Sequence, residues 1–168
     1  MKLEQLNQLD DASAQDWFSK CCAASQWTHM MSAKRPYSSV EQIEDYTRKI
    51  WPDLTEKDYR QAFEAHPMIG DINSLKKKFA STSGLAQQEQ SGAVGAEPSV
   101  LQRLSQLNHE YLAKNGFIFI ICATGLSAQQ MLTELELRIA NSTEQEIAIA
   151  AGQQLKITLL RIRKNLAS

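Results

Sequence analysis

The sequence predicts an all-α fold, and three observations support this prediction. Helix-start signals recur at short intervals along the 168 residues, and the apolar residues behind them repeat with the spacing of one helical face. The third observation is that residues 117–123 form the one β-branched and aromatic run, and a single strand cannot form a sheet. We therefore expect a single-domain bundle, residues 1–168, of about eight helices with a short extended buried segment around 117–123.

Five signals place helix starts, because each offers a side chain that can accept a hydrogen bond from the first turn of a helix. They are Ser13-Ala-Gln-Asp16, Ser38-Ser-Val-Glu41, Thr55-Glu-Lys-Asp58, Ser127-Ala-Gln-Gln130 and Thr143-Glu-Gln-Glu146. Three apolar faces follow at helical spacing, and we interpret them as core faces. They consist of Val40, Ile43, Thr47 and Ile50; of Leu101, Leu104, Asn108 and Tyr111; and of Ile147, Ala151, Leu155, Ile162 and Leu166.

Proline and glycine place the helix ends. Pro67 follows His66 and ends a helix over residues 56–65, because the residue before a proline is pushed out of the helical region. Pro98 fits the first turn of the next long helix, and Gly116 caps the end of that helix. Stretches rich in Pro, Gly and Gln predict loops. The loops expected are residues 67–73 and 87–97.

Composition and charge exclude several classes of protein. With 43% hydrophobic and 22% charged residues the chain is globular, and its net charge of −1 gives no overall attraction for nucleic acid or anionic lipid. The longest apolar run, 117–123, is about a third of what a membrane-spanning helix requires. The start of the chain has no signal-peptide core, and its end does not match a peroxisomal address. We expect a soluble, cytoplasmic protein that binds neither nucleic acid nor membrane.

Cysteine and histidine spacing favours neither a disulfide framework nor a metal site. Cys21 and Cys22 are adjacent and Cys122 stands alone, so there is no CxxC pair and reduced, buried thiols are expected. No histidine is followed by a second ligand three or four residues later. The histidines are His29, His66 and His109.

Four residues at three places in the chain are candidates for chemistry. His66 stands at a helix end before a proline and a glycine-containing loop, where it either serves a pocket or only satisfies the last helical carbonyls. Glu89 and Gln90 place an acid beside an amide, which either hold a polar ligand or are simply solvated. Arg161 lies close to an apolar stripe, so it bridges to an acid, binds an anionic ligand or extends its charged end to solvent.

One helix carries a polar pair with a structural interpretation. Asn108 and Tyr111 share a face, and we expect them to hold the extended segment by hydrogen bonds. His109 points away from that face, which places it on the surface.

Seven short motifs stand in a characteristic order. They are Arg35-Pro-Tyr37, His66-Pro-Met-Ile-Gly-Asp71, Glu89-Gln90, Asn108-His-Glu-Tyr111, the run from Gly116 to Gly125, Arg138-Ile-Ala-Asn141 and the segment from Lys156 to Ile162. Together they resemble the family of 2-oxo-4-hydroxy-4-carboxy-5-ureidoimidazoline (OHCU) decarboxylases of urate breakdown. The resemblance extends from about residue 6 to residue 166, and the HPxIGD element joined to FxFIxxATG carries most of it.

The resemblance implies an all-helical, usually homodimeric carboxy-lyase that uses no cofactor or metal. Its substrate is the small molecule OHCU, and its products are (S)-allantoin and CO2. The family roles fall on seven residues: His66 as the catalytic acid or base, Glu89 as a catalytic and ligand-holding group, Arg161 as the anion-binding guanidinium, Pro67 as a pocket wall, Gln90 as a ligand-holding amide, and Phe119 and Ile121 through their backbone groups. Ala86 departs from the family pattern, because a serine is usual there.

Two other classes of function are alternatives to the decarboxylase. A non-catalytic helical module that binds a protein partner would also show amphipathic helices, because similar folds host many functions. A metal-dependent hydrolase is disfavoured because the ligand spacing is absent.

Overall fold

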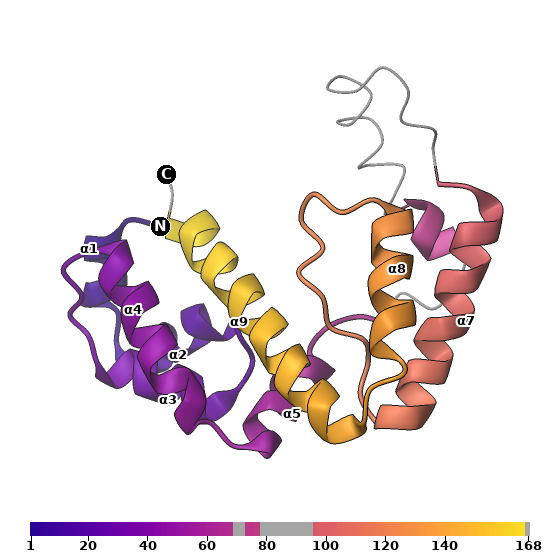
Figure 1. Cartoon of the computed structure of the whole chain (residues 1–168). Helices are drawn as coiled ribbons and strands as arrows, with labels where there is room; N and C mark the ends of the chain where they lie inside the picture. Colours follow the sequence, from indigo (N-terminus) through magenta and orange to yellow (C-terminus); the bar gives the residue numbers. More distant parts are fainter. Residues whose placement is uncertain (69–72, 78–95, 167–168) are drawn as a thin grey trace. The chain divides into compact units, whose positions relative to one another are not determined.

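The computed structural model describes residues 1–68, 73–77 and 96–166, and their regular structure is helical throughout (Figure 1). No strand occurs among these residues, and a short helical stretch covers 73–77. The other elements are α1 (Leu3–Gln8), α2 (Asp11–Ser19), α3 (Ser25–Ala33), α4 (Val40–Ile50), the 3-10 turn η1 (Trp51–Asp53), α5 (Glu56–Glu64), α7 (Pro98–Asn115), α8 (Ala128–Arg138) and α9 (Thr143–Leu166). The predicted all-α fold is confirmed.

The chain divides into two compact units. The first contains Met1–His66 together with Ile147–Ser168, and the second contains Pro67–Glu146. Helix α9 begins in the second unit and continues in the first. A single domain over residues 1–168 stays a prediction.

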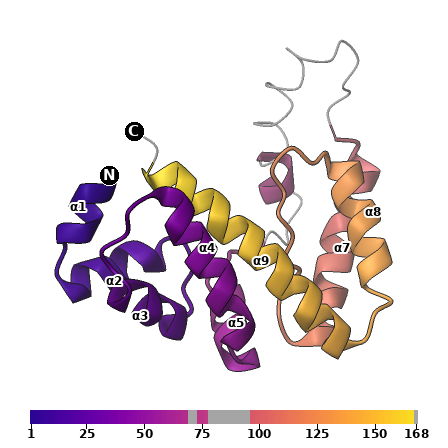
Figure 2. The same ribbon diagram turned by 60° about the vertical axis from the view of Figure 1, so that its left-hand side comes forward.

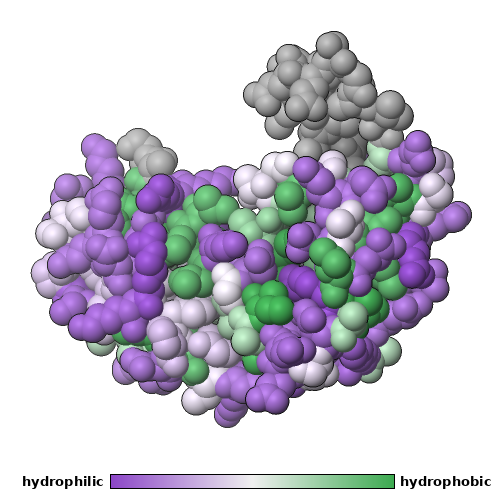
Figure 3. All heavy atoms as spheres, in the orientation of Figure 1, coloured by the Kyte–Doolittle hydropathy of each residue, from purple (hydrophilic) through white to green (hydrophobic). Residues whose placement is uncertain are grey.

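Aromatic side chains form much of the core of the first unit. Phe18 of α2 and Trp27 of α3 are fully buried and meet edge to face, with ring centroids 5.7 Å apart. Trp51 of η1 donates from its indole Nε1 to the main-chain oxygen of Ala151 at 3.1 Å, which ties η1 to α9. The outer faces of the N-terminal helices are mostly hydrophilic in Figure 3, as expected for amphipathic helices that bury one side.

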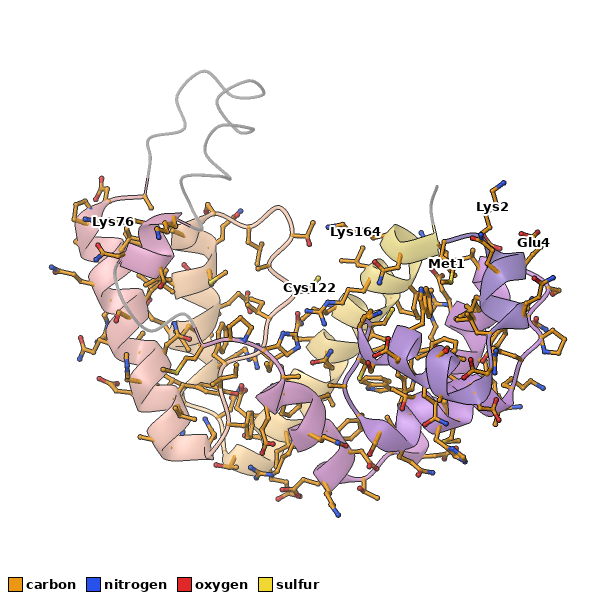
Figure 4. All side chains as sticks on the ribbon, turned by 180° about the vertical axis from the view of Figure 1, so that it is seen from behind. Met1, Lys2, Glu4, Lys76, Cys122 and Lys164 are labelled. Carbon is orange, nitrogen blue, oxygen red and sulfur yellow. The ribbon has the colours of Figure 1, made fainter. Side chains whose placement is uncertain are left out.

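The C-terminal part of α9 lies along α4 in both ribbon views (Figures 1 and 2). The buried carboxylate of Glu44 on α4 accepts hydrogen bonds from Arg163 of α9. The amino terminus reaches the same helix, because the Met1 nitrogen donates to the main-chain oxygen of Asn165 at 3.1 Å, and Figure 4 shows Met1 near Lys164. These contacts hold the two ends of the chain together.

The second unit is built on α7 and α8, which pack against each other. The segment that follows α7 is neither helix nor strand over residues 118–123, as predicted. Its first part is buried, and the rings of Phe117 and Phe119 meet the Tyr111 ring edge to face at 5.8 and 5.3 Å. The extended segment is therefore held by aromatic packing on α7.

A buried ionic cluster lies beside that segment. The Glu146 carboxylate, which is fully buried, accepts from the Tyr111 hydroxyl at 2.5 Å, from Arg138 Nε at 2.9 Å and from Asn141 Nδ2 at 2.8 Å. Arg138 also donates from Nη1 to the main-chain oxygen of Ile120 at 2.6 Å. Arg138, and not the predicted pair Asn108 and Tyr111, thus donates a hydrogen bond to the extended segment.

The hydrogen bonds expected from Asn108 and Tyr111 to the segment were therefore predicted wrongly. Asn108 Nδ2 donates to the Leu104 oxygen within its own helix at 2.8 Å, and the Tyr111 hydroxyl is used by Glu146. The prediction failed because Glu146 lies 35 residues away in sequence, and a buried carboxylate is a stronger acceptor than a backbone carbonyl. His109 is exposed, as predicted.

Most local signals for helix ends are confirmed. Thr55 and Ser127 both form capping boxes, Pro98 is the first residue of α7, and Gly116 ends that helix in the left-handed region with φ 75°. Only a glycine adopts that conformation without strain from a Cβ atom. Within the predicted loops, residues 69–72 and 87–95 lie outside the described residues.

Three of the helix starts are displaced from their predicted positions. In α2 the cap is the Asp10 carboxylate, which accepts from the Ser13 main-chain nitrogen at 2.9 Å. In α4 and α9 the capping hydroxyls belong to Ser39 and Ser142, one residue after and one residue before the predicted ones. Both sites have two hydroxyl residues in succession, and the sequence pattern cannot choose between them.

Candidate active site

His66 is placed by the end of α5. The helix stops at Glu64, and the main-chain nitrogen of His66 donates to the Phe63 oxygen at 3.1 Å in a last tightened turn. Pro67 prevents the helix from continuing. The imidazole is half-buried, and its Nε2 lies 2.6 Å from Oε1 of Gln154 on α9.

The Gln154 side chain is fully buried and has a second partner on its own helix. Its amide nitrogen donates to the Thr158 hydroxyl at 3.3 Å, and that hydroxyl donates to the Gln154 main-chain oxygen at 2.8 Å. Thr158 is also fully buried and interacts with the Cys22 thiol. A neutral line of hydrogen bonds therefore leads from His66 into the core.

Arg161 is partly buried on α9, seven residues after Gln154. Its Nη1 donates to the main-chain oxygen of Cys21 at 3.4 Å, and it has no ion-pair partner among the described residues. Of the alternatives left open by the sequence, an internal salt bridge to a described acid does not occur. The exposed charges nearby are those of Arg163 and Lys164.

The surroundings of His66 favour its neutral form. Burial lowers the pKa of the ring, the hydrogen bond with Gln154 partly opposes this shift, and the positive charge of Arg161 lowers the pKa further. Arg161 and Gln154, the partner of His66, lie about two turns apart on α9, which puts them on the same side of that helix. His66 is therefore an uncharged imidazole at neutral pH, able to accept a proton.

The neighbouring thiols are not nucleophiles at neutral pH. Burial raises the pKa of Cys21 and of Cys22 to about 11, so both remain protonated. The expectation of reduced, buried thiols is confirmed for these two, and Cys122 is a reduced, partly buried thiol.

Three of the remaining predicted site residues, Pro67, Phe119 and Ile121, fall in the second unit. Glu89 and Gln90 lie outside the described residues, as does Ala86. Pro67 is exposed directly after His66, and Ile121 is half-buried in the extended segment. The Phe119 ring is buried beneath the Arg138 guanidinium, 4.4 Å from its centre. The structure thus brings together His66 and Arg161 within the first unit.

Sequence reasoning missed Gln154 and Thr158. A signal for them exists, because residues 154, 158, 162 and 166 follow each other at intervals of four, and all four are buried. The buried face of α9 includes these two polar residues, while Ile147 and Leu155, which the predicted stripe contained, are only partly buried. A polar residue on a core face needs a partner, which His66 supplies.

Two features are absent from the described residues. No three His, Cys, Asp or Glu side chains gather there in a way that could hold a metal ion. None of the described helices combines the length and apolarity of a membrane span. The absence of a cofactor and of a metal stays a prediction.

The fold is all-helical, and its site combines a neutral histidine with a partly buried arginine, which are groups suited to proton transfer and to binding an anion. Comparison with known proteins identifies the class of protein. The family model for OHCU decarboxylase matches residues 7–163, and the chain therefore belongs to the OHCU decarboxylase family, which consists of carboxy-lyases. This membership favours an enzyme over the non-catalytic interaction module.

Individual relatives agree with the family. The chain is 38% identical over 154 residues to the uric acid degradation bifunctional protein TTL of Arabidopsis thaliana, covering 89% of this chain but 46% of that protein. It is 24% identical to an OHCU decarboxylase of Haloferax volcanii over 100% of this chain and 98% of the relative. A crystal structure of OHCU decarboxylase in the presence of (S)-allantoin superposes with a TM-score of 0.72 at 34% identity, covering 92% of this chain and 99% of that one.

Proposed function

We propose that this chain decarboxylates OHCU to (S)-allantoin and CO2 in urate degradation, without a cofactor, and that His66 and Arg161 act in the reaction. Family membership supports the activity. One structural observation carries the site assignment: a neutral imidazole stands near a guanidinium that has no described carboxylate partner. This is the combination that an anionic substrate requiring proton transfer needs.

The reaction breaks the bond between the substrate ring and its carboxylate. The electron pair of that bond moves into the ring, which acts as the electron sink, and CO2 leaves. The hydroxyl proton must depart as the carbonyl of allantoin forms, and one ring carbon must gain a proton on a single face. His66 suits both transfers, and a positioned acid or base contributes about 10² to 10⁴ in rate.

Arg161 is assigned to the substrate carboxylate. A guanidinium that holds this group equally well in the ground state and the transition state lowers KM and leaves the chemical step unchanged. Its contribution to kcat must come from orientation, or from contacts that strengthen as negative charge moves onto the ring. Proton delivery to one face, which gives a single enantiomer, requires such an orientation.

The other residues of the family motifs are assigned the rest of the substrate. In this proposal Glu89 and Gln90 accept and donate hydrogen bonds to the ureido group, Pro67 forms a wall, and the backbone near Phe119 and Ile121 binds ring atoms. The support is their match to family motifs. Homodimeric assembly and a cytoplasmic location stay predictions with the same kind of support.

The test uses freshly generated substrate. The product is chiral, so its circular dichroism signal reports turnover. We expect His66→Asn to keep the helical far-ultraviolet spectrum and to lose about 10²-fold or more of its rate. His109→Asn is the matched control, because this histidine is exposed on α7. A wild-type rate in His66→Asn would remove His66 from the mechanism.

A further inference from the structure

Gln154 stands out because it is an uncharged polar side chain with no exposed surface, next to the imidazole. Both ends of its amide are used: the oxygen faces His66 Nε2 at 2.6 Å, and the nitrogen faces the Thr158 hydroxyl at 3.3 Å. A buried polar group that has a partner at each end holds its own orientation and that of its neighbours.

The direction of this line of hydrogen bonds follows from Thr158. The Thr158 hydroxyl has one proton, and it donates that proton to the Gln154 main-chain oxygen at 2.8 Å. The same hydroxyl oxygen therefore accepts from the amide nitrogen of Gln154. The amide oxygen is left to face His66, and an amide oxygen only accepts. His66 Nε2 must therefore carry a hydrogen and donate it.

We propose that Gln154 is a positioning residue that fixes neutral His66 as the Nε2–H tautomer, so that Nδ1 is the atom that takes up the substrate proton. This inference rests on the proposed function and assigns its proton transfer to one ring atom. Among the described residues no hydrogen bond uses Nδ1. The ring is held at one nitrogen and offers its lone pair at the other.

The neutrality of Gln154 matters as much as its position. The described charged group near His66 is Arg161 on α9, and the titratable groups of the α2–α3 connection, Cys21 and Cys22, stay protonated. A carboxylate in place of the Gln154 amide would stabilise the imidazolium and raise its pKa. The amide orients the ring without adding a negative charge, so the neutral base persists to lower pH.

The tautomer can be observed directly in the full-length protein labelled with ¹⁵N-histidine. Long-range proton–nitrogen correlation spectra distinguish protonated from unprotonated ring nitrogens, and His66→Asn assigns the signals among the three histidines. We expect Nε2–H for neutral His66 in the wild type and a mixture of tautomers in Gln154→Leu. A wild-type ring protonated at Nδ1 would overturn the inference.

The pH profile of kcat/KM provides the second readout, one that a merely structural role would not move. In the wild type the acid limb should fall below pH 6.5, the ordinary value for histidine. Gln154→Glu, which keeps the shape of the side chain, should move this limb upward by about one pH unit or more. An acid limb unchanged in Gln154→Glu would contradict the role of the neutral amide.

Ala148→Glu is the matched control, because it adds the same charge to an exposed position of α9. Its pH profile should equal that of the wild type. Failure of the proposed function is distinguishable: a wild-type chain that forms no (S)-allantoin refutes the activity, while the tautomer measurement still tests Gln154. An active chain with the other tautomer refutes only the inference.

Discussion

Two buried polar networks contain residues of the same helix, α9, and they differ in charge. In the second unit the Glu146 carboxylate meets the Arg138 guanidinium and two uncharged donors, so the anion and the cation compensate each other. In the first unit the pair formed by His66 and Gln154 is neutral, and the nearby cation Arg161 has no ion-pair partner among the described residues.

The difference separates structure from function. Removing a charge from water costs several kcal/mol unless a partner is present, so a compensated cluster is complete without any ligand. The Arg161 guanidinium, beside a neutral base, has no such partner among the described residues, and an anionic ligand supplies the missing negative charge. The comparison predicts that changes in the first network affect turnover, whereas changes in the second affect folding.

The largest effect is expected from Arg138→Met, which leaves the Glu146 carboxylate buried without its cation. Breaking a buried pair from one side costs about 3–5 kcal/mol in the free energy of unfolding. Urea unfolding followed by circular dichroism measures this loss. The double variant Arg138→Met with Glu146→Gln should recover part of it.

A surface pair of the same unit serves as the control for Arg138→Met. Arg103 Nε lies 3.8 Å from Glu136 Oε1, and both side chains are about half exposed (45% and 48%). Arg103→Met should change the free energy of unfolding by less than about 1 kcal/mol, as is usual for exposed pairs. Equal losses at the two arginines would contradict the distinction between the compensated cluster and the surface.

The second prediction compares two tyrosine hydroxyls. Tyr111 donates to the charged Glu146 at 2.5 Å, whereas Tyr59 donates to the main-chain oxygen of Trp51 at 2.6 Å. Bonds to charged groups contribute about 1.5–3 kcal/mol and neutral ones about 0.5–1.5 kcal/mol. Thermal and urea unfolding should therefore show a larger loss for Tyr111→Phe than for Tyr59→Phe. A reversed order would contradict the stronger bond assigned to the Tyr111 hydroxyl.

The sequence predicts a feature well when the groups that determine it lie close together along the chain. The Thr55 cap and the Gly116 end were predicted correctly because the groups they satisfy lie within one turn of the chain. The all-α class followed from the sum of such signals. The caps of α4 and α9 were displaced by one residue, since adjacent hydroxyls are equivalent until the helix packs.

The candidate site was predictable only in part. His66 and Arg161 were identified by residue type and by their setting, a helix end and an apolar stripe. Gln154 was missed because its partner lies 88 residues away, and only the folded chain shows which polar residue faces the ring. Similarly, the sequence allows Arg161 an acid, an anionic ligand or solvent, and only the structure places it against the Cys21 carbonyl.

The third prediction concerns Arg161→Lys, which keeps the charge and loses the planar fork. We expect kcat/KM to fall about 10- to 100-fold, which equals about 1.4–2.8 kcal/mol, with little change in the free energy of unfolding. Arg163→Lys on the same helix is the control, because that arginine is exposed and pairs with Glu44. Unchanged kcat/KM in Arg161→Lys would remove the guanidinium from the site.

The smallest effect is expected at Glu44 of the first unit, whose buried carboxylate is paired with the exposed Arg163. The hydrogen bond from Arg163 lowers the pKa of this carboxyl below its ordinary value of 4.5, against the opposing effect of burial, and the charge of Arg163 and Arg48 adds to the lowering. A pKa depressed in the folded state contributes stability that is present above the unfolded value and is lost as the pH falls through the folded value. The difference in Tm between the wild type and Glu44→Gln should therefore shrink as the pH is lowered from 7 through 4.5 and below. A Tm difference at Glu44 that stays constant with pH would mean that the ionised pair contributes nothing to folding.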